Sequence, residues 1–303
     1  MCAKLTDPDR DRLPLLPFEQ MPALVLGATG MVGRFLIDRL ADGHVQTTAV
    51  SRQQQPARAG VEWVISDLTA LELGLDERPR VAFCAAPIWL LAPALPALRR
   101  AGVVRFVAFS STSRFTKTTS SVASEREVVR RLIEGETVVR TFCESNGIAW
   151  TILRPTVIYA EGEDRSITRL ANLIRRLGVL PLAGDALGKR QPVHADDLAA
   201  GALAAAVSPA AANRSYDLPG GETLSYRSMC ERIFEGMGRR TRIVSVPPFI
   251  WRLGLSVVAL RMPGITTEMG LRMAQDLTFD PTDAERDFQW RPRGFRPRFD
   301  HCN

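Results

Sequence analysis

The chain has 303 residues, of which 46% are hydrophobic, enough for a sizeable core in one large α/β domain or a domain with a smaller lobe. Its net charge of +6 comes from arginines scattered along the chain, so no basic block indicates a nucleic-acid partner. The five cysteines are widely spaced and form no Cys-x-x-Cys pair, which argues against a zinc site or a disulfide framework and favours a reduced, cytoplasmic protein.

Two segments deserve comparison with targeting and membrane sequences. Residues 1–20 are charged and contain prolines, so we expect a mobile leader and not a signal peptide. The apolar stretch 247–263 is broken by Arg252 and Arg261 and is shorter than the about 20 apolar residues of a spanning helix. We therefore expect no transmembrane segment. The stretch favours a helix covering a substrate lobe, with contact to a membrane surface as the alternative.

Short aliphatic or β-branched runs alternate with helical segments in the first half of the chain. The predicted strands are residues 23–26, 45–50, 62–65, 81–85, 105–109 and 149–153. Apolar residues at helical spacing follow the first strand, and residues 93–101 and 122–145 are predicted crossover helices. Because strands separated by helices pair in parallel, the sequence predicts an α/β fold with a Rossmann-type doubly wound parallel sheet.

A glycine-rich loop joins the first strand to the first helix. Gly27 allows a tight exit from the strand, Gly30 lets the backbone approach a pyrophosphate, and Gly33 lets the helix pack closely on the sheet. The amides at the helix N-terminus then face the phosphates. A GxxGxxG pattern in this position predicts a dinucleotide site, with a structural turn as the alternative. The predicted contacts are Gly27, Thr29, Gly30, Met31, Val32, Gly33 and Arg34.

The end of the second strand indicates which dinucleotide binds. An acidic side chain there would bind the ribose hydroxyl of NAD, but the residues are Val50-Ser51-Arg52-Gln53. Arg52 offers a cationic fork suited to a phosphate, and Arg34 starts on the same side of the site. We therefore predict NADP(H) in preference to NAD(H). The alternative is that both arginines are solvated surface residues.

After Pro155, prolines and glycines become frequent and the regular alternation stops. Residues 167–177 and 226–237 are predicted helices, and an alanine-rich helix over 196–207 begins with capping aspartates. We predict three parts: the leader 1–20; an NAD(P)-binding domain 21–160, to which 190–220 return; and a substrate-binding lobe made of 161–189 and 221–303.

Several marks occur in a fixed order along residues 22–297. After the glycine loop they are Ser66-Asp67-Leu68, Cys84-Ala85-Ala86-Pro87, Phe109-Ser110-Ser111-Thr112, residues 150–155 and residues 192–197. In this order the sequence resembles the short-chain dehydrogenase/reductase superfamily, in the extended or atypical branch that includes the NAD-dependent epimerase/dehydratase group. The resemblance implies cofactor contacts at Asp67, Leu68, Ala85, Ala86, Pro87, Ser110, Pro155, Val157 and Ile158. Taken alone, Asp67 is better explained as the cap of a turn and Pro155 as the end of a strand.

The same resemblance implies a Tyr followed four residues later by a Lys, which lowers the pKa of the phenol for proton exchange. The chain has only three tyrosines, and none has a lysine at that distance. Counting back from Glu136, the expected positions hold Val128 and Leu132. Thr112 best matches the remaining catalytic hydroxyl and Ser111 is the neighbouring candidate, although capping of a strand end explains either hydroxyl equally well. Tyr159 is a candidate substitute acid because it follows the predicted nicotinamide wall.

Two functions of different classes follow. The first is an NADP-preferring oxidoreductase or epimerase-like enzyme that acts on a small carbonyl or hydroxyl substrate, an apolar one if residues 249–260 cover the cleft. The second is a non-catalytic nucleotide-binding redox sensor or accessory subunit, which the missing Tyr/Lys pair favours. We expect a small-molecule partner, no metal, no nucleic acid, and a monomer or homodimer.

Overall fold

The structure is a computed structural model that describes residues 21–71, 73, 79–247, 251, 270 and 272–299. The predicted leader and nearly all of the apolar stretch 247–263 lie outside the described residues. Within the described part of the chain, no helix has both the length and the apolar character needed to cross a membrane.

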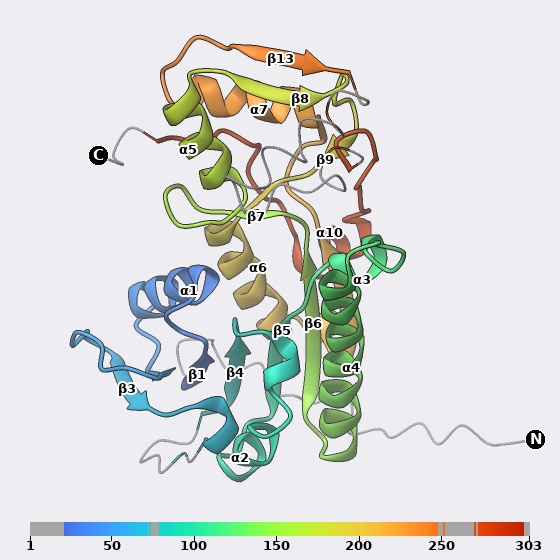
Figure 1. Cartoon of the computed structure of the whole chain (residues 1–303). Coiled ribbons are helices and arrows are strands. Elements are labelled where there is room, and N and C mark those ends of the chain that lie inside the picture. Colours follow the sequence, from blue (N-terminus) through green and yellow to red (C-terminus); the bar gives the residue numbers. More distant parts are fainter. Residues whose placement is uncertain are drawn as a thin grey trace, which may run out of the picture.

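A seven-stranded parallel sheet forms the centre of the protein (Figure 1). Its strand order is β3-β2-β1-β4-β5-β6-β11, which reverses direction between β1 and β4. The bounds are β1 Ala23–Leu26, β2 Thr47–Ser51, β3 Val61–Ile65, β4 Val81–Cys84, β5 Arg105–Phe109, β6 Ala149–Pro155 and β11 Arg214–Leu218. The predicted doubly wound sheet is therefore confirmed, and ligands of such sheets bind where the order reverses.

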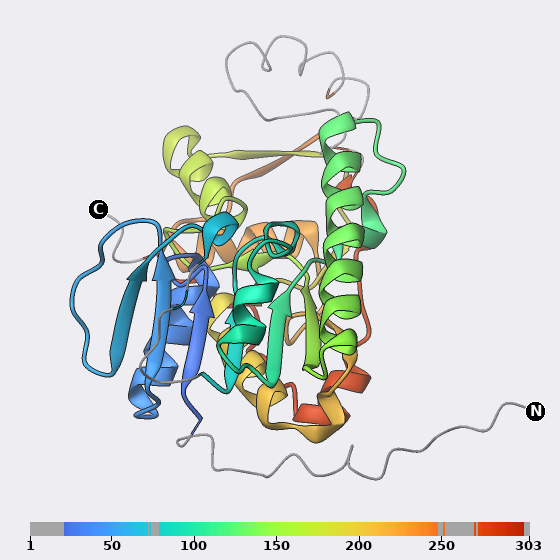
Figure 2. The ribbon, with the colours of Figure 1, turned by 90° about the horizontal axis from the view of Figure 1, so that it is seen from below.

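Helices cover both faces of this sheet, and successive residues of β1 show how the two faces are filled. Val25 packs with α1 (Met31–Asp42) and α6 (Ala195–Val207), whereas its neighbours Leu24 and Leu26 pack with α2 (Leu95–Arg100) and α4 (Ala123–Ser145). All three side chains are fully buried. Figure 2 shows the strands side by side between these helix layers. This alternation is the two-residue period of a strand that is buried on both faces.

A buried arginine joins the sheet to the C-terminal end of α6. Arg105, 4% exposed, donates to the carbonyl oxygens of Ala205 and Ala206 at 2.7 and 3.1 Å and to the hydroxyl of Thr151 at 2.6 Å. Helix C-termini carry carbonyls without intrahelical donors and a partial negative charge, so a cation is favourable there. Arg105 therefore fixes the end of α6 against β5 and β6.

Much of the chain after β6 forms a lobe beyond the carboxyl ends of the strands, whereas α6 and β11 return to the sheet (Figure 1). Its helices are α5 (Ile167–Leu177) and α7 (Tyr226–Gly236), and the smaller helices α3 (Ser113–Thr116) and α10 (Thr282–Phe288) lie nearer the sheet. Three two-stranded pairs complete it: β7 (Ile158–Tyr159) with β10 (Val193–His194), β9 (Lys189–Arg190) with β12 (Leu224–Ser225), and β8 (Leu180–Ala183) with β13 (Ile243–Val246).

Candidate active site

The glycine loop has the conformation that a phosphate-binding turn requires. Gly27 has φ 73°, and a Cβ there would lie 2.5 Å from the amide nitrogen of Ala86. A Cβ on Gly33 would lie 2.2 Å from the carbonyl oxygen of Gly27, so only glycine lets α1 approach β1 so closely. Gly30 caps α1 in an extended conformation without a capping side chain. The first-turn amides thus lack intrahelical acceptors, and the cradle fits a dinucleotide pyrophosphate.

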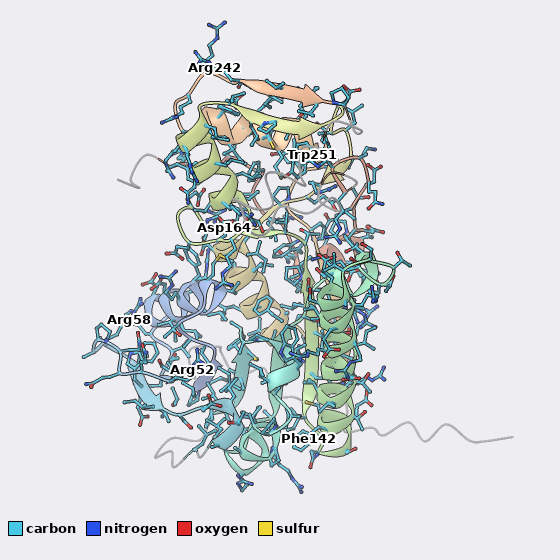
Figure 3. The ribbon with its side chains drawn as sticks, viewed as in Figure 1. Arg52, Arg58, Phe142, Asp164, Arg242 and Trp251 are labelled. Atoms are coloured by element: carbon cyan, nitrogen blue, oxygen red, sulfur yellow. The ribbon has the colours of Figure 1, made fainter. Side chains whose placement is uncertain are left out.

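The predicted residues around the adenosine lie at the ends of β2, β3 and β4. Arg52 is exposed directly after β2 (Figure 3). Asp67 accepts hydrogen bonds from the amide and hydroxyl of Thr69 at 2.8 and 2.7 Å, which lower the pKa of its carboxyl, and nearby Arg52 lowers it further. Leu68 begins the short helix η2 (Leu68–Ala70), which Asp67 caps. Ala85, Ala86 and Pro87 follow β4 with partial or full exposure.

Arg34 forms an ion pair with Glu163, which joins α1 to the loop that follows β7. Both side chains are about half exposed, at 50% and 41%. Such an exposed pair is weak, typically below about 1 kcal/mol, so it leaves Arg34 available to a bound phosphate. The roles of Arg34 and Arg52 toward a 2′-phosphate remain predictions.

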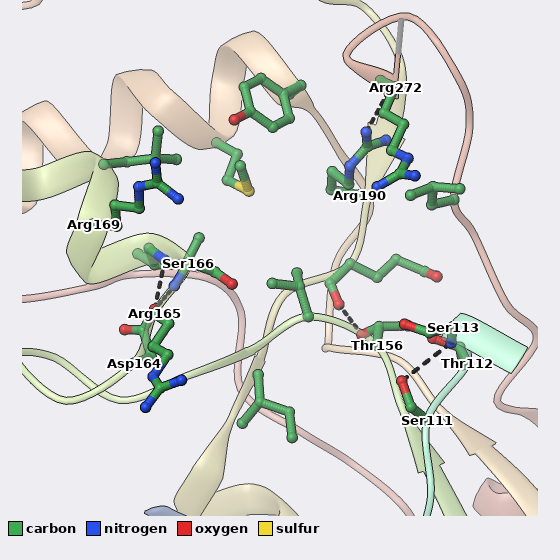
Figure 4. A pocket seen from close by; sticks show the side chains of 18 of the residues that line it. Ser111, Thr112, Ser113, Thr156, Asp164, Arg165, Ser166, Arg169, Arg190 and Arg272 are labelled. Atoms are coloured by element: carbon green, nitrogen blue, oxygen red, sulfur yellow. Dashed lines mark hydrogen bonds between the residues drawn. The ribbon is translucent and has the colours of Figure 1, made fainter. Parts of the chain in front are cut away.

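A cavity of about 1030 Å³ lies between the nucleotide-binding sheet and the lobe (Figure 4). On the sheet side its wall includes the predicted residues Met31, Ser111, Thr112, Val157 and Ile158. On the lobe side it includes side chains from α5, β9, α7 and the segment 272–279, which the sequence did not indicate as site residues: Arg169, Arg190, Tyr226, Arg272 and Phe279. The cavity therefore has room for a substrate next to the predicted nicotinamide wall.

The two candidate hydroxyls after β5 differ in their hydrogen bonds. The Thr112 hydroxyl, 6% exposed as a residue, donates to the carbonyl oxygen of Pro155 at 3.0 Å. The Ser111 hydroxyl instead accepts from the amide of Ser113 at 3.1 Å, and its own proton has no acceptor within the described part of the chain. Ser111 can therefore donate to a substrate oxygen, while Thr112 fixes the loop. Ser110 donates to Glu136 at 2.6 Å.

The structure places Tyr159 away from this cavity, which corrects its prediction as a substitute acid. Neighbouring residues of β7 face opposite sides, so Ile158 lines the cavity while Tyr159 points into a separate one of about 420 Å³. Tyr159 is 1% exposed and packs edge-on against His194 and Phe295, each at 5.0 Å between ring centroids. Burial also raises the pKa of its phenol, so Tyr159 acts as a core residue.

His194 caps a helix of the fold. Its Nδ1 accepts from the amide of Asp196 at 3.1 Å and thereby caps α6, and its Nε2 lies 3.2 Å from a carboxylate oxygen of Glu161. Because Nδ1 accepts, Nε2 carries the proton and donates to Glu161. The positions expected for the Tyr/Lys pair lie on α4, where Val128 is 37% exposed and Leu132 is 3% exposed within the core.

Cations outnumber accessible acids on the cavity wall. Asp164 accepts three backbone hydrogen bonds at the start of α5, so its charge serves that helix. Arg190 is 7% exposed, and within the described residues its guanidinium donates to the carbonyl oxygens of Lys189, Gln275 and Arg272 and not to a carboxylate. Burial lowers the pKa of Arg190, and its guanidinium lies 5.4 Å from the ring centroid of Tyr226. The wall therefore suits a substrate with polar or anionic groups.

Comparison with known proteins agrees with this geometry. The family described as NAD(P)H-binding matches residues 27–176, which run from the glycine loop to the end of α5. This part of the chain is an NAD(P)H-binding domain. It contains the glycine loop, β2 to β7 and part of the cavity wall.

Relatives of this chain include uncharacterized oxidoreductase YesF of Bacillus subtilis, 27% identical over 234 residues, covering 75% of this chain and 75% of that protein. An NAD(P)H azoreductase of Xenophilus azovorans is 25% identical over 236 residues, covering 74% and 76%. Other curated relatives are longer: the chain spans 50% of the length of one uncharacterized Sinorhizobium fredii protein and 60% of an Arabidopsis thaliana subunit named for NADH dehydrogenase.

Among solved structures, an epimerase from Methanothermobacter thermautotrophicus superposes with a TM-score of 0.70 at 19% identity, covering 92% of this chain and 90% of that one. UDP-glucose 4-epimerase from Thermotoga maritima, solved with UDP-glucose, gives a TM-score of 0.66 at 17% identity, covering 90% and 94%. At these identities the similarity establishes the epimerase-like fold, lobe included.

Proposed function

We propose that the protein is an NADPH-preferring oxidoreductase or epimerase-like enzyme that acts on a small carbonyl or hydroxyl substrate. The observation that carries this proposal is the cavity of about 1030 Å³, whose wall joins Met31 of the glycine loop, Ile158 and Ser111 to the lobe. A non-catalytic fold would have no need for such a space beside the nicotinamide wall. The bound dinucleotide would supply hydride chemistry, and the protein would supply binding and orientation.

Different residues would bind the pyrophosphate, the 2′-phosphate and the substrate. The amides of Gly30, Met31 and Val32 would hold the pyrophosphate, and Arg34 and Arg52 the 2′-phosphate. Ser111 would donate a hydrogen bond to the substrate oxygen, because its proton is uncommitted within the described residues. The cationic side of the lobe supports a substrate with a polar or anionic end, and the apolar stretch that suggested an apolar substrate lies largely outside the described residues.

The test is a binding titration followed by a turnover assay. NADPH and NADH would each be titrated by nucleotide fluorescence, and a panel of aldehydes, ketones and sugar-derived carbonyls would then be screened for NADPH oxidation. Saturable NADPH binding with turnover of at least one carbonyl supports the proposal. Absence of binding to either nucleotide would contradict both the enzymatic and the non-catalytic alternatives.

Arg52 gives a specific prediction about cofactor preference. The substitution Arg52→Asp replaces a cation at the end of β2 with an anion that would repel a 2′-phosphate and accept from a ribose hydroxyl. We expect NADPH to bind about 10- to 100-fold more weakly and NADH to bind equally or more tightly, corresponding to about 1.4–2.8 kcal/mol for NADPH. Arg291→Asp, at an exposed position after α10 that forms no ion pair within the described residues, is the matched control. An unchanged NADPH affinity in Arg52→Asp would refute the NADP assignment.

A non-catalytic nucleotide-binding sensor or accessory subunit is the second candidate. Leu132 favours it, since the position expected for the catalytic lysine is an aliphatic side chain packed in the core. NADPH binding without oxidation by any member of the carbonyl panel would support this candidate. For either function we propose a cytoplasmic monomer or homodimer, with the nucleotide-binding domain formed by residues 21–160 and 190–220 and the lobe by 161–189 and 221–303.

A further inference from the structure

Carbonyl reduction in the large cavity requires a proton donor, and one lysine lines that cavity. Lys117 follows α3, directly after the Ser111-Thr112 segment, and lines the large cavity together with Ser113 and Thr116. Of the chain's lysines, Lys189 does not line the cavity and Lys4 lies outside the described residues. Lys117 does not form the helical Tyr/Lys pair expected on α4, but it brings an ammonium group to the same space from another element.

Lys117 forms an ion pair with a glutamate of α4. Its Nζ lies 3.2 Å from a carboxylate oxygen of Glu125 on α4, and its side chain is 32% exposed. Glu125 is shared: Arg272 donates to it at 2.7 Å and through a second, shorter contact, and Ser120 donates at 2.5 Å. Glu125 therefore holds Lys117 and Arg272 close together on this wall.

Other polar groups on the wall are less suited to give up a proton. Arg190 and Arg272 are guanidinium groups, which do not release protons at ordinary pH. Tyr226 lies on α7 of the lobe, and burial raises the pKa of its phenol above the ordinary value. Asp164 is occupied by the amides of α5. A lysine ammonium is a donor that can lose its proton in a turnover cycle.

We propose that Lys117 is the general acid of this site, an inference that rests on the proposed reductase function. When the substrate carbonyl carbon accepts a hydride, the electron pair of the C=O π bond moves to oxygen, and that oxygen takes a proton from Lys117 Nζ. The carbonyl is reduced to an alcohol, the dinucleotide is oxidised, and the neutral amine regains its proton from solvent. Glu125 and Arg272 position the ammonium, and Ser111 donates a second hydrogen bond to the same oxygen.

The test uses the full-length protein with para-nitrobenzaldehyde as the carbonyl probe and NADPH oxidation as the signal. Lys117→Met should lower kcat about 100-fold or more, as expected for loss of a general acid, while KM and the NADPH dissociation constant stay within about threefold. Lys117→Arg keeps the charge and the contact with Glu125 and should lose a similar factor in kcat, because a guanidinium does not give up its proton. Wild-type kcat should fall at alkaline pH as the ammonium deprotonates, and this fall should be absent from Lys117→Met.

The control variant is Lys189→Met, whose side chain lies outside the cavity wall and which should keep wild-type kcat. A second readout does not depend on turnover. With only three lysines in the chain, methyl NMR of the reductively methylated protein can assign each signal by single substitutions. Addition of NADP⁺ with para-nitrobenzyl alcohol should shift the Lys117 signal and leave the Lys189 signal in place.

The possible failures separate the two proposals. Turnover by the wild type that persists unchanged in Lys117→Met and Lys117→Arg, with no shift of the Lys117 signal, would overturn the role of Lys117 and leave the enzymatic function standing. NADPH binding by the wild type without oxidation by any carbonyl would overturn the enzymatic function, and the role of Lys117 as an acid with it.

Discussion

Glu125 is held by three donors on the cavity side of α4. Hydrogen bonds from Arg272 have the largest effect on the pKa of the Glu125 carboxyl, and hydrogen bonds from Ser120 and Lys117 add to it. Together they lower this pKa from about 4.5 to about 2, although partial burial acts to raise it. Because the folded-state pKa lies below the unfolded value, the carboxylate contributes stability above pH 4.5. That contribution is lost as the pH falls from about 4.5 to about 2.

We predict that Glu125→Gln lowers the free energy of unfolding at neutral pH by about 1–2 kcal/mol, allowing for solvent screening. The difference between variant and wild type should shrink steadily below pH 4.5, as measured by urea unfolding at a series of pH values. Glu134→Gln, which removes an exposed pair with Arg130 on the same helix, is the matched control and should change little. A Glu125→Gln deficit that stays constant through the acid range would contradict the assignment.

Hydrogen bonds separate residues that are equivalent in the sequence. Ser111 and Thr112 are adjacent hydroxyls after one strand, and sequence pattern favours Thr112 as the catalytic match. Only coordinates show that Thr112 donates to the carbonyl of Pro155 while the Ser111 proton is uncommitted within the described residues. Tyr159 likewise follows the predicted nicotinamide wall in sequence, but the two-residue period of β7 turns it to the opposite side.

At the scale of elements, the contact between β1 and α1 depends on Gly33. We predict that Gly33→Ala destabilises the protein by about 1–3 kcal/mol, as is usual for overpacking, because its Cβ would lie 2.2 Å from the carbonyl oxygen of Gly27. NADPH affinity should also fall at least about tenfold, since the helix N-terminus must move away from the loop. Urea unfolding and nucleotide titration measure the two effects.

Gly43→Ala at the other end of α1 is the matched control. Gly43 has φ −81°, and its added Cβ would lie 3.3 Å from the carbonyl oxygen of Arg39, which asks for a small adjustment only. We expect a change below about 1 kcal/mol and an unchanged NADPH affinity. If Gly33→Ala resembles Gly43→Ala in both measurements, the close packing of α1 on the loop is not what the fold requires.

The sequence identifies strands with apolar runs better than strands without them. Apolar runs predict β1 to β6 to within two residues at each end, the edge strand β3 included. The strand β11 has the sequence Arg-Ser-Tyr-Asp-Leu and lies at the other edge of the sheet, beside β6. Only its Tyr216 and Leu218 are buried, so no hydrophobic run marks it. The paired strands of the lobe are two to four residues long, too short for a clear period.

At the scale of the whole molecule, the site is built from segments that are far apart in the chain. Met31, Ser111, Ile158, Arg190 and Tyr226 meet at one cavity although they span nearly 200 positions of sequence. The cofactor half could be predicted because one glycine loop and one strand end carry most of its pattern. The substrate half could not, because it depends on how the lobe folds back over the carboxyl ends of the sheet.

The central claim is that one cavity receives both the nicotinamide and the substrate. The most direct measurement is a crystal structure of the protein grown with NADP⁺. We predict the pyrophosphate on the first-turn amides of α1 and the nicotinamide beside Ile158, at the opening of the cavity near Ser111. A nicotinamide bound elsewhere, or a cavity closed by the protein's own side chains when the dinucleotide is in place, would contradict the account.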